Sequence, residues 1–292
     1  FTLFNLAKAI SGNSISGYVA ITLYLLNPFI TTWHTFILTE SLYSSLVIFT
    51  CWTFYKAFTF RSYKNILIFI IVLLLTILTR PNGWIFLPLL IGFCLFYSKL
   101  QLKIQISGLV IIFFSFIFLA STVPAFQKAI SLTTPVELMQ EGEVVWGHPE
   151  LRIEMPKENF SDEQNWYQGY KYIIKHPLSC SKLAFVRVGY MFIQIRSHHS
   201  PAFKVHILLW IIPAYLLALI GILKFRQSKI TRIALAIILG HAFIVGLTYA
   251  THESRFLIYI LPIIYLLSGC GFVYLMDTII PFFLIMLHNS TL

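Results

Sequence analysis

Residues 204–223 have the sequence KVHILLWIIPAYLLALIGIL, in which Lys204 is the single charged side chain. A helix of about 20 mostly apolar residues is long enough to cross the hydrocarbon core of a bilayer. Comparable apolar runs occur at 16–37, 41–60, 65–79, 83–97, 104–125, 231–250 and 256–276. The sequence therefore predicts an all-α polytopic membrane protein.

The composition of the 292-residue chain excludes two other classes of protein. Hydrophobic residues make up 58% of the chain, charged residues make up 11%, and the mean hydropathy is +0.80. A soluble domain contains about 25% charged residues, and a disordered chain needs low hydrophobicity. A single water-soluble domain and a disordered chain are both excluded.

The two ends of the chain carry shorter apolar stretches. Residues 1–11 are expected to be the end of a helix that Gly12 closes. Residues 279–287 are apolar but, taken alone, too short to cross a membrane.

The positive charges of the chain predict its orientation in the membrane. When the predicted helices alternate in direction, ten basic residues fall in gaps on one side, which is the cytoplasmic side because Lys and Arg mark cytoplasmic loops. They are Lys8, Lys56, Arg61, Lys64, Lys99, Lys103, Lys224, Arg226, Lys229 and Arg232. The polar segments 39–41, 80–82, 127–203 and 251–255 then share the extracytoplasmic side. The isoelectric point near 9.4 thus reflects membrane topology, and no nucleic-acid partner is expected.

Three parts of the chain follow from this topology. Residues 1–126 are predicted to hold the N-terminal transmembrane helices, the first of them incomplete, and residues 204–292 the C-terminal ones. Residues 127–203 are predicted to form an extracytoplasmic loop, because they contain eight acidic and eight basic residues and no long apolar run.

The loop is expected to contain two short helices. Ser161 and Gln164 match a capping box that opens a helix toward His176, and Pro177 suits the start of the next helix. In that second helix Phe185, Val188, Phe192 and Ile195 form an apolar face, which is typical of an amphipathic helix on a membrane surface.

The cysteines and histidines do not predict a metal site or a cofactor site. Cys180 is the single cysteine of the loop, so it is expected to be accessible to water. His198 and His199, with His206 nearby, have no carboxylate at helical spacing, so no metal site is expected there, and no cofactor is expected either.

Four ionisable residues at the outer helix ends are candidates for function, since a charge within the membrane costs about 2.5–3.5 kcal/mol on insertion scales. Glu40 is either a carboxylate facing a polar cavity or an acid favoured by the dipole of a helix N-terminus. Arg80 and Arg255 either bind a phosphate through bidentate hydrogen bonds or reach toward lipid head groups. Glu253 lies beside Arg255 in the sequence.

Three motifs in fixed order resemble a known family. They are LTESL at 38–42, preceded by Pro28; LTRPN at 78–82; and HESRF at 252–256, followed by Leu261-Pro262. Together they resemble the polytopic glycosyltransferases of the GT-C fold. Within that group they are most similar to family 39, which includes protein O-mannosyltransferases and the aminoarabinose transferase that acts on lipid A. The segment YIIKHP at 172–177 and Arg187 resemble the outer-loop segment of that family.

The resemblance implies a GT-C-like helix bundle with an outer-face loop domain. It also implies transfer of a sugar from a polyprenyl-phosphate donor to a lipid, glycan or protein acceptor on the extracytoplasmic face. Arg80 and Arg255 match positions expected to serve the donor phosphate, with Asn82, His252 and Glu253 as further substrate-binding residues. Glu40 matches a supporting acid.

The same resemblance places the general base on an Asp in the first outer loop, which would precede Phe1. The chain is therefore expected to be an N-terminally truncated form, inactive in sugar transfer by itself. The frequent Ile, Phe and Lys residues fit an AT-rich bacterial genome and hence the inner membrane of a bacterium.

A transporter or flippase of a lipid-linked sugar is the alternative. It would share the helices and the arginines with a transferase. It would not need a long neutral outer loop, and it would more often show an internal hydropathy repeat, which this sequence lacks.

Overall fold

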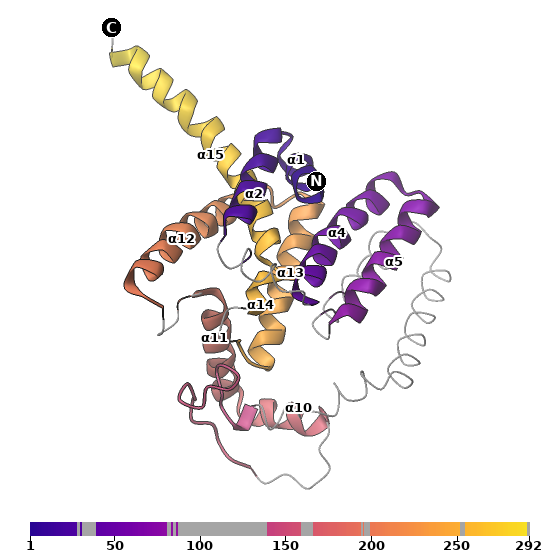
Figure 1. Cartoon of the computed structure of the whole chain (residues 1–292), viewed down its shortest axis with the longest axis vertical. Helices are drawn as coiled ribbons and strands as arrows, with labels where there is room; N and C mark the ends of the chain where they lie inside the picture. Colours follow the sequence, from indigo (N-terminus) through magenta and orange to yellow (C-terminus); the bar gives the residue numbers. More distant parts are fainter. Residues whose placement is uncertain are drawn as a thin grey trace. The chain divides into compact units, whose positions relative to one another are not determined.

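A computed structural model of the chain describes residues 1–27, 30, 39–80, 83, 86, 139–158, 166–193, 195, 199–251 and 255–290. These residues are mainly helical and contain no β-strand, only isolated bridges between Glu143 and Arg152 and between Val145 and Ala250. Figure 1 labels the helices α1 (Thr2–Ser11), α2 (Ser14–Leu26), α4 (Thr39–Phe60), α5 (Tyr63–Thr79), α10 (Trp166–Lys175), α11 (Pro177–Ile193), α12 (Pro201–Lys224), α13 (Lys229–Leu247), α14 (Arg255–Ile258) and α15 (Leu261–Ser290). The prediction of an all-α protein is confirmed for the described residues.

Three helices of the described residues are candidates to span a membrane. Pro201–Lys224, Lys229–Leu247 and Leu261–Ile279 are long and apolar enough to cross a bilayer, and α2 and α5 are shorter apolar helices. One face of α12 exposes a stripe of apolar side chains, each at least half exposed: Leu209, Ile212, Leu216, Leu219 and Leu223. Such a stripe is costly in water and stable in lipid, so the chain is a membrane protein.

Two helices differ in length from the apolar runs that predicted them. The run 16–37 is interrupted, because α2 ends at Leu26 and Asn27 has an extended backbone. The Asn27 side chain donates a hydrogen bond to the Tyr265 hydroxyl (2.6 Å) and accepts one from the Ile30 backbone N–H (3.0 Å), which fixes this turn. At the other end of the chain, α15 continues to Ser290, so the stretch 279–287 extends a helix instead of standing alone. Except for Gly83 and Phe86, the runs 83–97 and 104–125 lie outside the described residues.

The chain forms two compact units. The first consists of residues 1–80, 195–239 and 257–292, and the second of residues 81–194 and 240–256. The three-part division at residues 126 and 203 stays a prediction.

Small residues allow the helices of the first unit to pack closely. At Gly221 in α12, an added Cβ would overlap the backbone carbonyl of Leu267 in α15, and at Gly271 it would overlap that of Leu217. The Ser268 hydroxyl donates a hydrogen bond to the Ala214 carbonyl across the same interface (2.7 Å). Close backbone approach of this kind is how helices associate in lipid, where no hydrophobic force drives them together.

Capping residues in the local sequence determine where several helices begin and end. Gly12 closes α1 with φ 76° and donates its N–H to the Lys8 carbonyl, as predicted. Asn13 then begins α2 by accepting a hydrogen bond from the Ile15 N–H. The Ser62 hydroxyl caps α5 in the same way through the Asn65 N–H.

Helices α4 and α5 form an antiparallel pair that positions the candidate site. Figure 1 shows them side by side, joined by the short turn at 61–62. Thr50 and Thr76 hydrogen-bond across the pair (2.8 Å), and the rings of Phe54 and Phe69 pack edge to face. This pairing brings the start of α4 and the end of α5 to the same end of the unit.

Replacing Gly271 by Leu is expected to lower the thermal stability of the detergent-solubilised protein, by about 1–3 kcal/mol if the helices can shift apart. The reason is that the new side chain meets backbone atoms of α12, which cannot rotate away. The measurement is thermal unfolding followed by circular dichroism. Gly189→Ala is the control, because an added Cβ at Gly189 meets nothing within 4 Å. An equal loss of stability in both variants would contradict the close packing of α12 and α15.

Candidate functional site

A partly buried ion pair lies at the end of the α4–α5 pair. The Arg80 guanidinium donates from Nη2 to Glu40 Oε1 at 3.0 Å. Glu40 lies in the first turn of α4, and Arg80 directly follows α5. The antiparallel packing thus brings together two residues that are 40 positions apart in the sequence and that were both predicted to be functional.

Two tyrosines complete this cluster, and sequence reasoning missed both. The ring of Tyr259 lies under the guanidinium, with 5.0 Å between the ring centroid and Arg80 Cζ. Tyr43, one turn after Glu40 in α4, packs edge to face on Tyr259 at 4.9 Å. Both tyrosines are fully buried. The signal that could have revealed them is spacing: Tyr43 is three residues from Glu40, and Tyr259 is four residues from Arg255.

The two charges of the pair differ in access to solvent. The side chain of Glu40 is 0% exposed, whereas that of Arg80 is 18% exposed. The carboxylate is therefore the more deeply buried member of the pair and orients the guanidinium, which also lies over the ring of Tyr259. An anion approaching this end of the α4–α5 pair would meet the cation first.

Of the other predicted site residues, the structure describes Arg255 but not Asn82, His252 or Glu253. Arg255 is half-buried and begins α14 in the second unit, where the Thr251 hydroxyl accepts a hydrogen bond from the Phe256 N–H. Asn82, His252 and Glu253 lie outside the described residues. Their roles, and that of Arg255, stay predictions.

The second unit is organised by a buried cation, Arg187 of α11. Its Nε donates to the Glu143 carbonyl at 2.9 Å, and its Nη1 donates to the Gly246 carbonyl at 3.3 Å and contacts Met139 Sδ. The residue is 0% exposed, and burial lowers the pKa of the guanidinium to about 10, so it stays charged at neutral pH. Arg187 therefore ties three segments together: residues 139–143, α11 and the end of α13.

A second connection joins the loop to the segment after α13. Val145 and Ala250 form a parallel bridge, in which the Trp146 N–H donates to the Ala250 carbonyl and the Ala250 N–H donates to the Val144 carbonyl. The ring of Trp146 stacks on that of Tyr249 at 6.2 Å. The stretch 139–146 is thus held by backbone and side-chain contacts.

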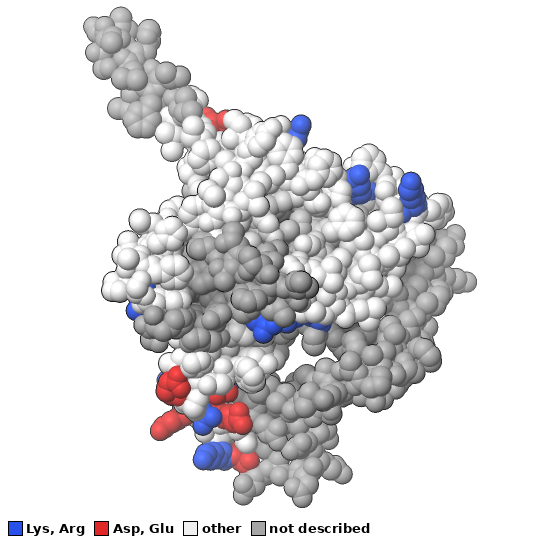
Figure 2. Space-filling model, in the orientation of Figure 1, with Lys and Arg blue, Asp and Glu red and all other residues white. Residues whose placement is uncertain are grey.

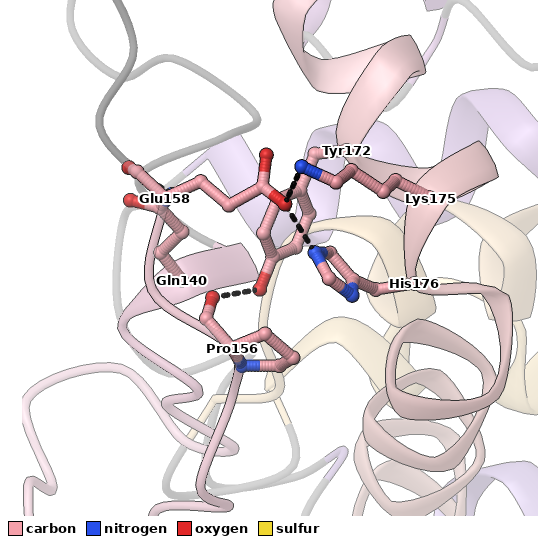
Figure 3. Close-up of polar contacts among 6 residues, drawn as sticks. All are labelled: Gln140, Pro156, Glu158, Tyr172, Lys175 and His176. Carbon is pink, nitrogen blue, oxygen red and sulfur yellow. Dashed lines mark hydrogen bonds and ion pairs between the residues drawn. The ribbon is translucent and has the colours of Figure 1, made fainter.

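The segment YIIKHP has a structural role in the same unit, shown in Figure 3. Glu158 Oε1 accepts hydrogen bonds from Lys175 Nζ and His176 Nε2, each at 2.6 Å. The Tyr172 hydroxyl donates to the Pro156 carbonyl at 2.7 Å. The side chains of Tyr172, Lys175 and His176, at and just after the end of α10, therefore contact residues 156 and 158 of the preceding segment, which explains the YIIKHP pattern without a substrate.

One expectation about the loop helices needs correction, although Pro177 does begin α11. Cys180 was expected to be accessible, but it is 5% exposed. Burial also raises the pKa of its thiol, so it should react slowly. The buried face of α11 consists of Cys180, Leu183, Arg187 and Met191, whereas Phe185 is 78% exposed. The predicted apolar face is therefore not packed against the protein, and its contact with a membrane surface stays a prediction. The expected capping box at Ser161 and Gln164 lies outside the described residues.

Comparisons with protein-family models, with curated proteins and with solved structures find no match to this chain. The resemblance to family 39 glycosyltransferases therefore stays a prediction from the motifs.

Replacing Glu40 by Gln is expected to destabilise the first unit by about 3–5 kcal/mol, because it leaves the Arg80 cation without its carboxylate in a largely buried site. The double variant Glu40→Gln/Arg80→Gln should recover part of that loss, because no charge remains to be compensated. Chemical unfolding in detergent measures both. Strictly additive effects of the two single substitutions would contradict a direct ion pair.

Acid is expected to loosen the contact between α10 and residues 153–158. Hydrogen bonds from Lys175 and His176 lower the pKa of Glu158 in the folded protein. Their contribution to stability is therefore present above the ordinary Glu pKa of about 4.3. It is lost as the pH falls through the lowered, folded-state value. Hydrogen exchange of residues 166–176, corrected for intrinsic rates, should be faster at pH 3 than at pH 7. Glu158→Gln should exchange fast at both pH values, and slow exchange in that variant would contradict the assignment.

Proposed function

We propose that the chain belongs to a membrane glycosyltransferase that takes a sugar from a polyprenyl-phosphate donor and transfers it on the extracytoplasmic face. The observation that carries the proposal is the cluster of Glu40, Arg80 and Tyr259 at the end of the α4–α5 pair. Glu40 and Arg80 belong to the LTESL and LTRPN motifs, which are 40 residues apart and meet at 3.0 Å.

The chemistry of the donor explains why a cation is needed at this place. An acceptor hydroxyl or amine attacks the anomeric carbon of the sugar, and the bond from that carbon to the phosphate oxygen breaks with its electron pair. Negative charge then grows on the polyprenyl phosphate. A guanidinium held in a fixed orientation stabilises that charge without having to reorganise. Arg80 has this geometry, because the carboxylate of Glu40 and the ring of Tyr259 fix it from two sides.

The burial of Glu40 supports a positioning role for this acid. A general base must reach the proton of the acceptor within hydrogen-bond distance. With a side chain that is 0% exposed and bonded to Arg80, Glu40 has no path to an acceptor in this state. The proposal therefore assigns Glu40 to the orientation of Arg80 and assigns removal of the acceptor proton to a different group.

The architecture of the second unit favours a transferase over the transporter alternative. Residues 139–158, α10 and α11 fold around buried Arg187 and contact residues 246–250. A folded unit of this kind can bind an acceptor. A flippase needs a path for the head group across the membrane and has no need for it.

Replacing Arg80 or Arg255 by Gln is expected to weaken the binding of a polyprenyl phosphate by about tenfold to hundredfold, the value of a charge-assisted hydrogen bond in a partly dry site. The measurement is native mass spectrometry of the purified chain with the lipid in detergent. Lys224→Gln is the matched control, because Lys224 is also a cation at a helix end and packs on the ring of Tyr274.

Two results would count against the proposal. One is an equal loss of affinity in all three variants, which would mean that the affinity depends on the total positive charge of the protein and not on these two arginines. The other is wild-type binding of the phosphate-free polyprenol as tight as that of the phosphate, which would remove the need for an arginine. Movement of a donor between leaflets with its sugar retained would favour the transporter.

A further inference from the structure

A cavity lies in the first unit at the opposite end of α4 from Glu40. Its volume is about 360 Å³, and the residues that line it are Ala9, Tyr55, Phe58, Thr59, Arg61, Ser228, Lys229 and Ile230. They come from the end of α1, the last turn of α4, the turn that follows, and the start of α13. No lining residue belongs to the cluster around Arg80.

Two cations share one aromatic ring at this cavity. Lys229 Nζ is 3.5 Å from the centroid of the Phe58 ring, and Arg61 Cζ is 5.9 Å from the same centroid. Two positive charges that contact the same ring repel each other. An anion placed between them would turn that repulsion into attraction on both sides.

The backbone of Arg61 gives independent support. Arg61 follows the last residue of α4 with φ 48°, and its N–H donates to the Ala57 carbonyl. It is the single described non-glycine residue with positive φ. Glycine normally takes this position after a helix, because a side chain is strained there. An arginine in a strained conformation beside a cavity indicates a use for its side chain.

Acidic residues are absent from the segments that surround the cavity. Residues 1–39, 41–136 and 204–252 contain neither Asp nor Glu. In Figure 2, basic atoms near the α4–α5 turn have no acidic atoms beside them on the face that is drawn. The positive potential of this end is therefore not cancelled by carboxylates of these segments.

We propose that this cavity binds a phosphate group. Arg61 and Lys229 supply the charge, the hydroxyls of Thr59, Ser228 and Tyr55 supply hydrogen bonds, and the N-terminus of α13 adds its dipole. Phe58, Ile230 and Ala9 form an apolar wall that suits the carbon chain next to the phosphate. Basic pockets between transmembrane helices bind anionic lipid head groups, and a soluble phosphate ester has the same recognition chemistry. The site is independent of the proposed glycosyltransferase activity.

The experiment is native mass spectrometry of the full chain in detergent with phosphatidylglycerol, and with phosphatidylcholine as the zwitterionic comparison. Arg61→Asn removes the charge and keeps a residue that tolerates positive φ, and Lys229→Gln removes the second charge. Each should weaken phosphatidylglycerol binding by about fivefold, the effect of one basic residue at an anionic surface. Lys224→Gln, which removes a cation that packs on Tyr274, should leave it nearly unchanged.

A second arm separates the two sources of phosphate. If glycerol 3-phosphate displaces the lipid from the wild-type protein, the ligand is a soluble phosphate ester; if it does not, the ligand is a membrane lipid. Either result supports the site when Arg61→Asn lowers the affinity. Equal binding of phosphatidylcholine, or an equal effect of Lys224→Gln, would overturn the proposal. Arg61→Gly serves as a second variant, because it relieves the backbone strain and should lose the ligand without losing stability.

Discussion

The ion pair between Glu40 and Arg80 is the interaction that holds the start of α4 and the end of α5 together in the first unit. A carboxylate with no exposed surface persists in a membrane protein only with a cation beside it, because an unpaired buried charge costs several kcal/mol. The pair constrains the start of α4, the end of α5 and, through the ring of Tyr259, the turn before α15. Each of these positions is a helix end, where polar residues of a short motif can be placed without disturbing the packing between the helices.

In the second unit, too, an arginine joins separate segments of the chain, but its partners differ. Arg187 is also buried, but backbone carbonyls of Glu143 and Gly246 accept its hydrogen bonds. A cation that binds carbonyls of separate segments holds those segments together. Arg80 retains some exposure whereas Arg187 has none. That difference supports a ligand-binding role for Arg80 and a structural role for Arg187.

The sequence predicted the helices well where a long apolar run met a clear stop signal. Gly12 and Pro177 ended or began helices as expected, because a glycine in the αL region and a proline at a helix start act locally. The sequence also identified Glu40 and Arg80, since charges next to apolar runs are conspicuous. It did not predict that they form a pair, and it missed Tyr43 and Tyr259. Contacts between helices depend on rotation and register, which apolar runs without strong periodicity do not define. The error at Cys180 has the same origin: the polar composition of residues 127–203 predicted exposure, but Cys180 lies with Arg187 on the buried face of α11.

Photo-crosslinking with a polyprenyl phosphate that carries a diazirine beside the phosphate is the most direct test of a donor site at the Glu40–Arg80 pair. Adducts mapped by mass spectrometry show which end of the helices the phosphate meets. If the donor phosphate binds at the Glu40–Arg80 pair, we expect adducts in peptides that contain residues 39–43, 78–80 or 255–259. These adducts should be lost in the Arg80→Gln variant. Adducts confined to residues 55–64 and 228–232 would place the lipid phosphate at the basic cavity instead and would contradict a donor site at the Glu40–Arg80 pair.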